Sequence, residues 1–160
     1  FASYATLAES PTSSAARQDT IYKTQSMFNQ AAGIADQIQS ARQEADGRLQ
    51  SAIETVNPLL EQIDKLNKTI ASGSVVNQDV TGAQNAQLGL INELSKYMDV
   101  KVEPRANGGV TLRTNTGTTL VGEGAATLSY QAAGTVDAMT AFSDIMITEP
   151  SGTRWPLRPR

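Results

Sequence analysis

The sequence predicts an α+β protein in which a long helix and a short antiparallel helix precede a small antiparallel β domain. Three observations lead to this fold class. Apolar residues recur every three and four residues from residue 21 to residue 70, which is the pattern of one long amphipathic helix. A shorter stretch with helical spacing follows between residues 82 and 98. After Asp99 the apolar residues alternate with polar ones, which is typical of strands.

The long helix is expected to start at Ser10-Pro11 and to end at Ser72-Gly73-Ser74. Ser10 can accept hydrogen bonds from free amide groups, and Pro11 at the first helical position loses no required donor. Residues 1–8 are interpreted as the last turns of an earlier helix. Pro58 interrupts the backbone hydrogen bonding of the long helix. Because the apolar repeat keeps its register across Pro58, we predict a kink there and not a break.

The repeat defines a helix-packing seam, by which the long helix is expected to contact other helices. We assign these residues to the seam: Phe28, Ala35, Ile38, Leu49, Ala52, Val56, Leu59, Ile63, Leu66 and Ile70. Arg42 falls at a seam position, and we interpret it as a side chain that extends along the helix to bring its charge into water. Further apolar residues at Ile34, Ile53 and Leu60 widen the seam. This width favours packing within a helical bundle over a two-stranded coiled coil.

We divide the chain into an elongated helical domain at residues 1–98 and a small β-rich domain at residues 99–160. In the second of these, Val100 and Val102 alternate with charged residues, and the turn signal Asn107-Gly108 follows. Strands are also expected at three later segments, namely 118–121, 127–131 and 144–148. Residues 154–160 are predicted to form an irregular end.

The composition leaves few kinds of catalytic chemistry. The chain has no His and no Cys, which excludes disulfides, thiol nucleophiles, imidazole acid–base catalysis and the usual zinc ligands within it. Carboxylates such as Glu61 and Asp64 fall on the outward face of the long helix, where we interpret them as solvated charges. No glycine-rich loop has the spacing or the lysine of a phosphate-binding motif. We therefore expect no enzyme activity, no catalytic, cofactor-binding or metal site, and no cofactor.

Charge and hydropathy argue against two kinds of partner. The net charge is -3, and no cluster of basic residues is interleaved with aromatic ones, so nothing favours a nucleic acid. No apolar run approaches the ~18 residues that a membrane span requires, and no signal segment opens the chain. We expect neither nucleic acid nor a membrane as partner.

Two further features have competing interpretations. Asn67-Lys68-Thr69 matches the acceptor pattern for N-glycosylation, but it lies within the helix, so we reject this reading. Trp155 is the single tryptophan and is either an anchor for a partner or the apolar plug of a terminal segment. We favour the plug.

Four segments within residues 1–125 carry a distinctive sequence. They are LAESPTSSAAR at residues 7–17, IDKLNKTI at 63–70, LINELS at 90–95, and the stretch from Val100 through Asn107-Gly108-Gly109-Val110 to Leu120-Val121-Gly122. These segments resemble the flagellar hook-associated protein 1 family, whose members form the junction between hook and filament. The family often carries Asp-x-Arg-Asp where this chain has Asn85-Ala86-Gln87-Leu88, so salt bridges made by those charges are not expected here.

The resemblance implies a structural subunit of the hook–filament junction that acts by contacts between subunits. It also implies export through the flagellar type III apparatus without a cleaved signal peptide, and a location outside the cell in the flagellum. The partners would be the hook protein, the second hook–filament junction protein and further copies of the chain in a ring. The terminal helices of the family are missing from this sequence, so we expect a monomer with a partly uncovered seam.

One alternative from another class remains open. A coiled-coil stalk that carries a β domain, as in an adhesin or a phage-tail fibre, would share the long helix. Such a stalk would associate with copies of itself through the seam.

Overall fold

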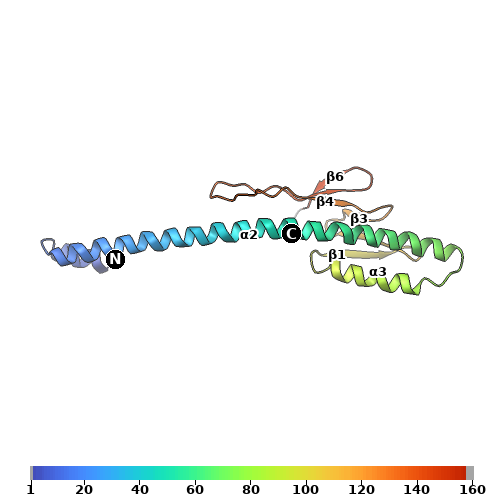
Figure 1. Ribbon diagram of the computed structural model, residues 1–160, viewed down its shortest axis with the longest axis horizontal. Coiled ribbons are helices and arrows are strands. Elements are labelled where there is room, and N and C mark those ends of the chain that lie inside the picture. Colours follow the sequence, from blue (N-terminus) through green and yellow to red (C-terminus); the bar gives the residue numbers. More distant parts are fainter. Residues whose placement is uncertain (1, 158–160) are drawn as a thin grey trace. The chain divides into compact units, whose positions relative to one another are not determined.

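A computed structural model describes residues 2–157 of the chain (Figure 1). The chain forms two compact units, and the boundary between them falls within the long helix. Unit 1 comprises the residues up to Glu44 together with Thr135–Met139, and unit 2 comprises Ala45–Gly134 and the residues from Thr140 onward. Helices come first in the chain and small antiparallel sheets follow, so the predicted α+β fold is confirmed.

Helix α1 (Ala2–Glu9) precedes the long helix, as expected from residues 1–8. It is held to the long helix by polar contacts within unit 1. The hydroxyl of Thr20 donates to the carbonyl of Ser3 at 3.0 Å, and the hydroxyls of Tyr4 and Thr24 lie 2.7 Å apart.

The long helix α2 (Ser14–Val75) starts later than predicted. The expected start at Ser10-Pro11 is wrong, because these residues belong to the segment that connects α1 to α2. Ser13 is the residue that caps the helix, since its hydroxyl accepts the amide hydrogen of Ala16 at 3.3 Å.

Helix α2 continues through Pro58 without a break and ends at Val75, one residue beyond the predicted terminator Ser72-Gly73-Ser74. Gly73 lies inside the helix for a packing reason, because a Cβ atom at this position would lie 2.4 Å from Cγ1 of Val80. The chain turns away at Asn77, which adopts a left-handed conformation with φ of 56°.

Helix α3 (Thr81–Leu94) runs back alongside the C-terminal part of α2, as Figure 1 shows. It is shorter than the predicted stretch from 82 to 98, because the chain leaves the helix in a turn after Leu94, where the amide of Tyr97 donates to the Leu94 carbonyl at 2.9 Å. Ile91 and Leu94 of α3 are buried in the core of unit 2.

Unit 2 contains two antiparallel sheets of three strands each. The first has the order β1 (Val100–Pro104), β2 (Val110–Thr114), β3 (Thr119–Val121), and the second has the order β4 (Thr127–Ser129), β5 (Met146–Thr148), β6 (Arg154–Pro156). The prediction of an irregular end is wrong for β6, because Trp155 pairs with Ile147 of β5. Residues 158–160 of that predicted segment lie outside the described residues.

The core of unit 2 combines side chains from α2, α3 and both sheets. The members that are at most 1% exposed are Leu60, Ile63, Leu94, Leu112, Leu120, Val121 and Ile147. They come from both sides of residues 98 and 99, between which the sequence suggested a domain boundary. The division into domains at 1–98 and 99–160 stays a prediction.

Candidate functional site

Large apolar side chains are exposed on one face of α2 in unit 1. We define this uncovered stripe by Ile21, Met27, Phe28, Ile34 and Ile38, which are between 53% and 63% exposed. At 100° per residue they fall within about 140° of the helix circumference, which makes them one face. The seam residues Phe28 and Ile38 belong to the stripe, and the seam residue Ala35 lies exposed among them.

The remaining seam residues lie in unit 2, where their environment differs. Val56, Leu59, Ile63 and Ile70 are buried, while Leu49, Ala52 and Leu66 are half-buried. Ile53 and Leu60, which widen the seam, are also buried. One continuous apolar repeat therefore packs into a core in unit 2 and remains exposed in unit 1.

Helix α2 also holds the loop Thr135–Met139 of unit 1. The guanidinium of Arg42 donates to the carbonyl of Asp137 at 2.7 Å and to Oε1 of Gln39 at 3.0 Å. Oε1 of Gln43 accepts the amide hydrogen of Val136 at 3.3 Å. Arg42 therefore does more than extend along the helix toward water, because its guanidinium binds the backbone of this loop.

Two asparagine side chains of α2 each bind both backbone groups of one β residue. We call them the asparagine clamps. Nδ2 of Asn57 donates to the Leu128 carbonyl at 2.9 Å, and the Leu128 amide donates to Oδ1 of Asn57 at 2.8 Å. Nδ2 of Asn67 donates to the Val110 carbonyl at 2.8 Å, and the Val110 amide donates to Oδ1 of Asn67 at 2.7 Å. Oδ1 of Asn67 also accepts from Nε2 of Gln87 at 2.9 Å.

The clamp at Asn67 bears on the glycosylation motif that the sequence contains. Asn67 is 5% exposed and both atoms of its amide group are engaged. The folded chain therefore offers no accessible acceptor at this position, in agreement with our reading of the motif.

Asp46 of α2 binds two residues of the segment that follows β4. Its carboxylate accepts hydrogen bonds from the hydroxyl of Tyr130 and, at 3.0 Å, from the amide of Ala133. The hydrogen bond to Asp46, together with burial, raises the pKa of Tyr130 to about 12. Sequence reasoning missed Asp46, Asn57 and Asn67, although a signal existed: at 100° per residue, all three fall within about 80° of each other beside the apolar face.

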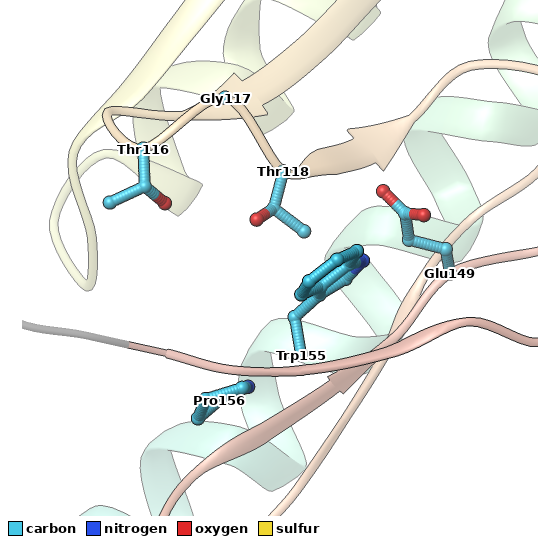
Figure 2. Close-up of a pocket in the computed structure, with 6 residues that line it drawn as sticks. All are labelled: Thr116, Gly117, Thr118, Glu149, Trp155 and Pro156. Carbon is cyan, nitrogen blue, oxygen red and sulfur yellow. The ribbon is translucent and has the colours of Figure 1, made fainter.

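A pocket of about 450 Å³ opens in unit 2 (Figure 2). It is lined by the loop between β2 and β3, by the end of β5 and by β6, through the residues Thr116, Gly117, Thr118, Glu149, Trp155 and Pro156. Figure 2 shows the indole of Trp155 beside Glu149, with Thr118 facing it from the other wall. Trp155 is 49% exposed, so the interpretation of this residue as an apolar plug is wrong.

Residues 2–157 contain no group of three or more Asp or Glu side chains that could hold a metal ion. No helix in this part of the chain has an apolar stretch that could cross a membrane. The features that stand out among the described residues are the uncovered stripe, the asparagine clamps and the pocket around Trp155, which we call the Trp155 pocket.

Comparisons with known proteins relate the chain to flagellar proteins. Residues 1–152 match the family described as the helical domain of the flagellar hook-associated protein FlgK. The solved structure of the flagellar hook junction protein FlgK from Burkholderia pseudomallei shares the fold, with a TM-score of 0.75 and 22% sequence identity over 98% of this chain. The chain spans 28% of the length of that protein. A comparison with curated protein sequences gave no match.

Proposed function

This chain belongs to the family of the flagellar hook-associated protein FlgK, and we propose that it acts at the hook–filament junction through contacts between subunits and without catalysis. The resemblance that the sequence motifs indicate is thereby confirmed at the level of the family. A structural role in the flagellum is part of our proposal. In this proposal the partners are the hook protein, the second junction protein and further copies of the chain, all outside the cell. Export without a cleaved signal peptide is part of the same proposal.

The observation that carries the proposal is the match of residues 1–152 to the FlgK helical domain. The uncovered stripe of α2 indicates in addition that this chain packs against further helices. Five large apolar side chains that lie on one face and are each more than half exposed lower the solubility of a monomer, and such patches mark interaction sites. An apolar helix face of this kind is buried when another helix packs against it. The chain spans 28% of the length of the FlgK relative, so a full-length subunit of that size has further segments that can cover the stripe.

We assign the stripe to packing within the full-length subunit. The contacts with neighbouring subunits then fall to the charged face of α2, where Glu54, Glu61 and Lys65 are exposed. Reversing these three charges is expected to weaken junction assembly. Normal assembly after the reversal would mean that the subunit contacts are made by another surface.

Complementation of a bacterial strain that cannot swim because its junction protein has been deleted tests the role of the stripe. The full-length protein is supplied with Phe28→Ser and Ile38→Ser together, or with Leu88→Ser, which changes an equally exposed apolar residue of α3. The stripe variant is expected to be secreted but to leave hooks without filaments in electron micrographs, while the Leu88→Ser variant restores swimming. Full swimming with the stripe variant would refute the assignment.

A further inference from the structure

We propose that the Trp155 pocket is a docking site for a basic side chain, arginine or lysine, presented by a neighbouring polypeptide. The proposal rests on the pocket alone and is independent of the flagellar assignment.

The first observation is the exposed aromatic ring. Trp155 is the only tryptophan of the chain and remains half exposed inside a pocket of about 450 Å³. This volume lies within the range of about 300–1,000 Å³ that is typical of ligand sites. Tryptophan is the side chain whose ring face attracts cations most strongly, and it is enriched among the residues that dominate protein interfaces.

The second observation is a carboxylate beside that ring. Oε1 of Glu149 accepts the amide hydrogen of Thr119 at 3.1 Å, which fixes the side chain in the pocket wall. Within residues 2–157 Glu149 has no salt bridge, whereas Glu103 and Glu123 of the same unit are paired with arginines. The pocket therefore combines an oriented negative charge with an aromatic face.

The third observation concerns the opposite wall. Thr118 lies beside the indole with its methyl group toward the ring and its hydroxyl turned away from it (Figure 2). That hydroxyl can accept a hydrogen bond from an ammonium or guanidinium group that enters the pocket. Arg113 is not among the residues that line the pocket, and it donates to the Gly117 carbonyl at 3.3 Å and to the Thr119 hydroxyl at 3.0 Å. Nε of Arg113 also forms a salt bridge with Oε2 of Glu103 at 3.2 Å. Arg113 therefore stabilises the loop and leaves Glu149 as the charge that lines the pocket.

These features favour a cation over a neutral occupant. A neutral sugar or an apolar side chain would cover the Glu149 carboxylate without compensating its charge, which is costly. A basic side chain can stack on the indole and pair with the carboxylate at once.

Fluorescence of Trp155 gives a direct test, because no other tryptophan contributes. The probe is N-acetyl-L-argininamide, and its matched control is N-acetyl-L-citrullinamide, which has the same shape without the charge. Titrations are made at low ionic strength, where surface charges are least screened. Arg158 and Arg160 follow Trp155 closely in the sequence, so both are changed to glutamine in every protein used, which keeps the chain's own cations out of the titration.

We expect saturable binding of argininamide with a Kd in the millimolar range, and binding of citrullinamide about tenfold weaker. Glu149→Gln keeps an oxygen to accept the Thr119 amide but removes the charge, so it should reduce argininamide binding about tenfold. Glu123→Gln, which removes a carboxylate elsewhere in unit 2, should leave binding unchanged.

Three results would overturn the proposal. They are equal affinity for the two probes, unchanged argininamide binding in Glu149→Gln, and a signal that does not saturate up to about 100 mM. Saturable binding of maltose that is the same with and without Glu149→Gln would also overturn it, and would identify a site for neutral carbohydrate.

Discussion

Asn57 and Leu128 exchange two hydrogen bonds, one from the side-chain amide to the backbone carbonyl at 2.9 Å and one from the backbone amide to the side-chain oxygen at 2.8 Å. Leu128 is 4% exposed, so water cannot readily replace either bond. A single side chain of α2 thus satisfies the backbone of a buried residue that is 71 positions away in the sequence.

Asn57→Ala is expected to lower the free energy of unfolding by about 1–3 kcal/mol, because the amide and carbonyl of Leu128 lose their partner. Urea unfolding followed by circular dichroism measures the change. Gln62→Ala, which alters an exposed polar residue of the same helix, serves as the control and should have little effect. Equal effects of the two changes would mean that the clamp does not stabilise the fold.

Gly109→Ala is expected to destabilise the chain by about 1–3 kcal/mol. A Cβ atom at Gly109 would lie 2.6 Å from Oδ1 of Asn67, so the second clamp would have to shift. Gly89→Ala is the matched control, since a Cβ atom there meets nothing within 4 Å and alanine favours the helix α3 by up to about 1 kcal/mol. The thermal midpoint should fall for the first variant and rise for the second, and the reverse order would contradict this account.

Ile63→Ala and Ile38→Ala change the same residue type at two seam positions with different environments. Ile63 is fully buried, so its truncation is expected to cost about 2–5 kcal/mol. Ile38 is exposed in this chain, and its truncation should cost less than about 1 kcal/mol. Urea unfolding of both variants measures the difference, and similar losses would show that the stripe is covered in solution.

Tyr130→Phe should lower stability by an amount that depends on pH. The pKa of Tyr130 is raised from 10.0 to about 12 in the folded chain, mainly by its hydrogen bond to Asp46, so the neutral hydroxyl stabilises the fold. This contribution is fully present below the unfolded pKa of about 10 and is lost as the pH rises through about 12. The difference in unfolding free energy between wild type and variant should therefore shrink as the pH is raised from about 8 to about 11.

Asp46→Asn provides the control for that prediction. It removes the charge that holds the Tyr130 hydroxyl, so the pKa of Tyr130 should fall toward its ordinary value. The ionisation of Tyr130 is measured by the absorbance of tyrosinate at alkaline pH. The absorbance of the Tyr130→Phe variant is subtracted, which removes the signal of the other tyrosines. An unchanged ionisation of Tyr130 in Asp46→Asn would contradict the assigned cause.

The isolated chain is expected to sediment as a monomer at micromolar concentration. A stable dimer buries about 800 Å² of surface on each partner. The five exposed side chains of the stripe offer too little apolar surface for that. Sedimentation velocity decides the matter. A stable dimer or trimer that Phe28→Ser dissociates would instead favour a coiled-coil stalk.

Much of the fold follows from signals that are local in the sequence. The period of the apolar residues predicted α2, and the signal Asn107-Gly108 predicted the hairpin of β1 and β2, in which Gly108 adopts a φ of 83°. The features that were missed depend on residues far apart in the chain. Strand β6 exists because β5 is beside it, and Arg42 is fixed by Asp137, which lies 95 positions away.

The seam shows the same limit at the level of the site. A periodic pattern records which face of a helix is apolar, but not what covers that face. Ile38 and Ile63 satisfy the same repeat, yet only Ile63 meets a core of its own chain. The clamps were missed because a polar residue beside an apolar face reads as a surface residue until its partner is known.

The clamp at Asn57 has a consequence for association between chains. Strand β4 has a neighbour on one side only, because the order of its sheet is β4-β5-β6. The open edge of such a sheet is a template on which another polypeptide can add a strand and start aggregation. Asn57 occupies the amide and carbonyl of Leu128 in the middle of β4, so an incoming strand would first have to displace a helix. Helix α2 thereby protects the β4 edge of this sheet from the addition of another strand.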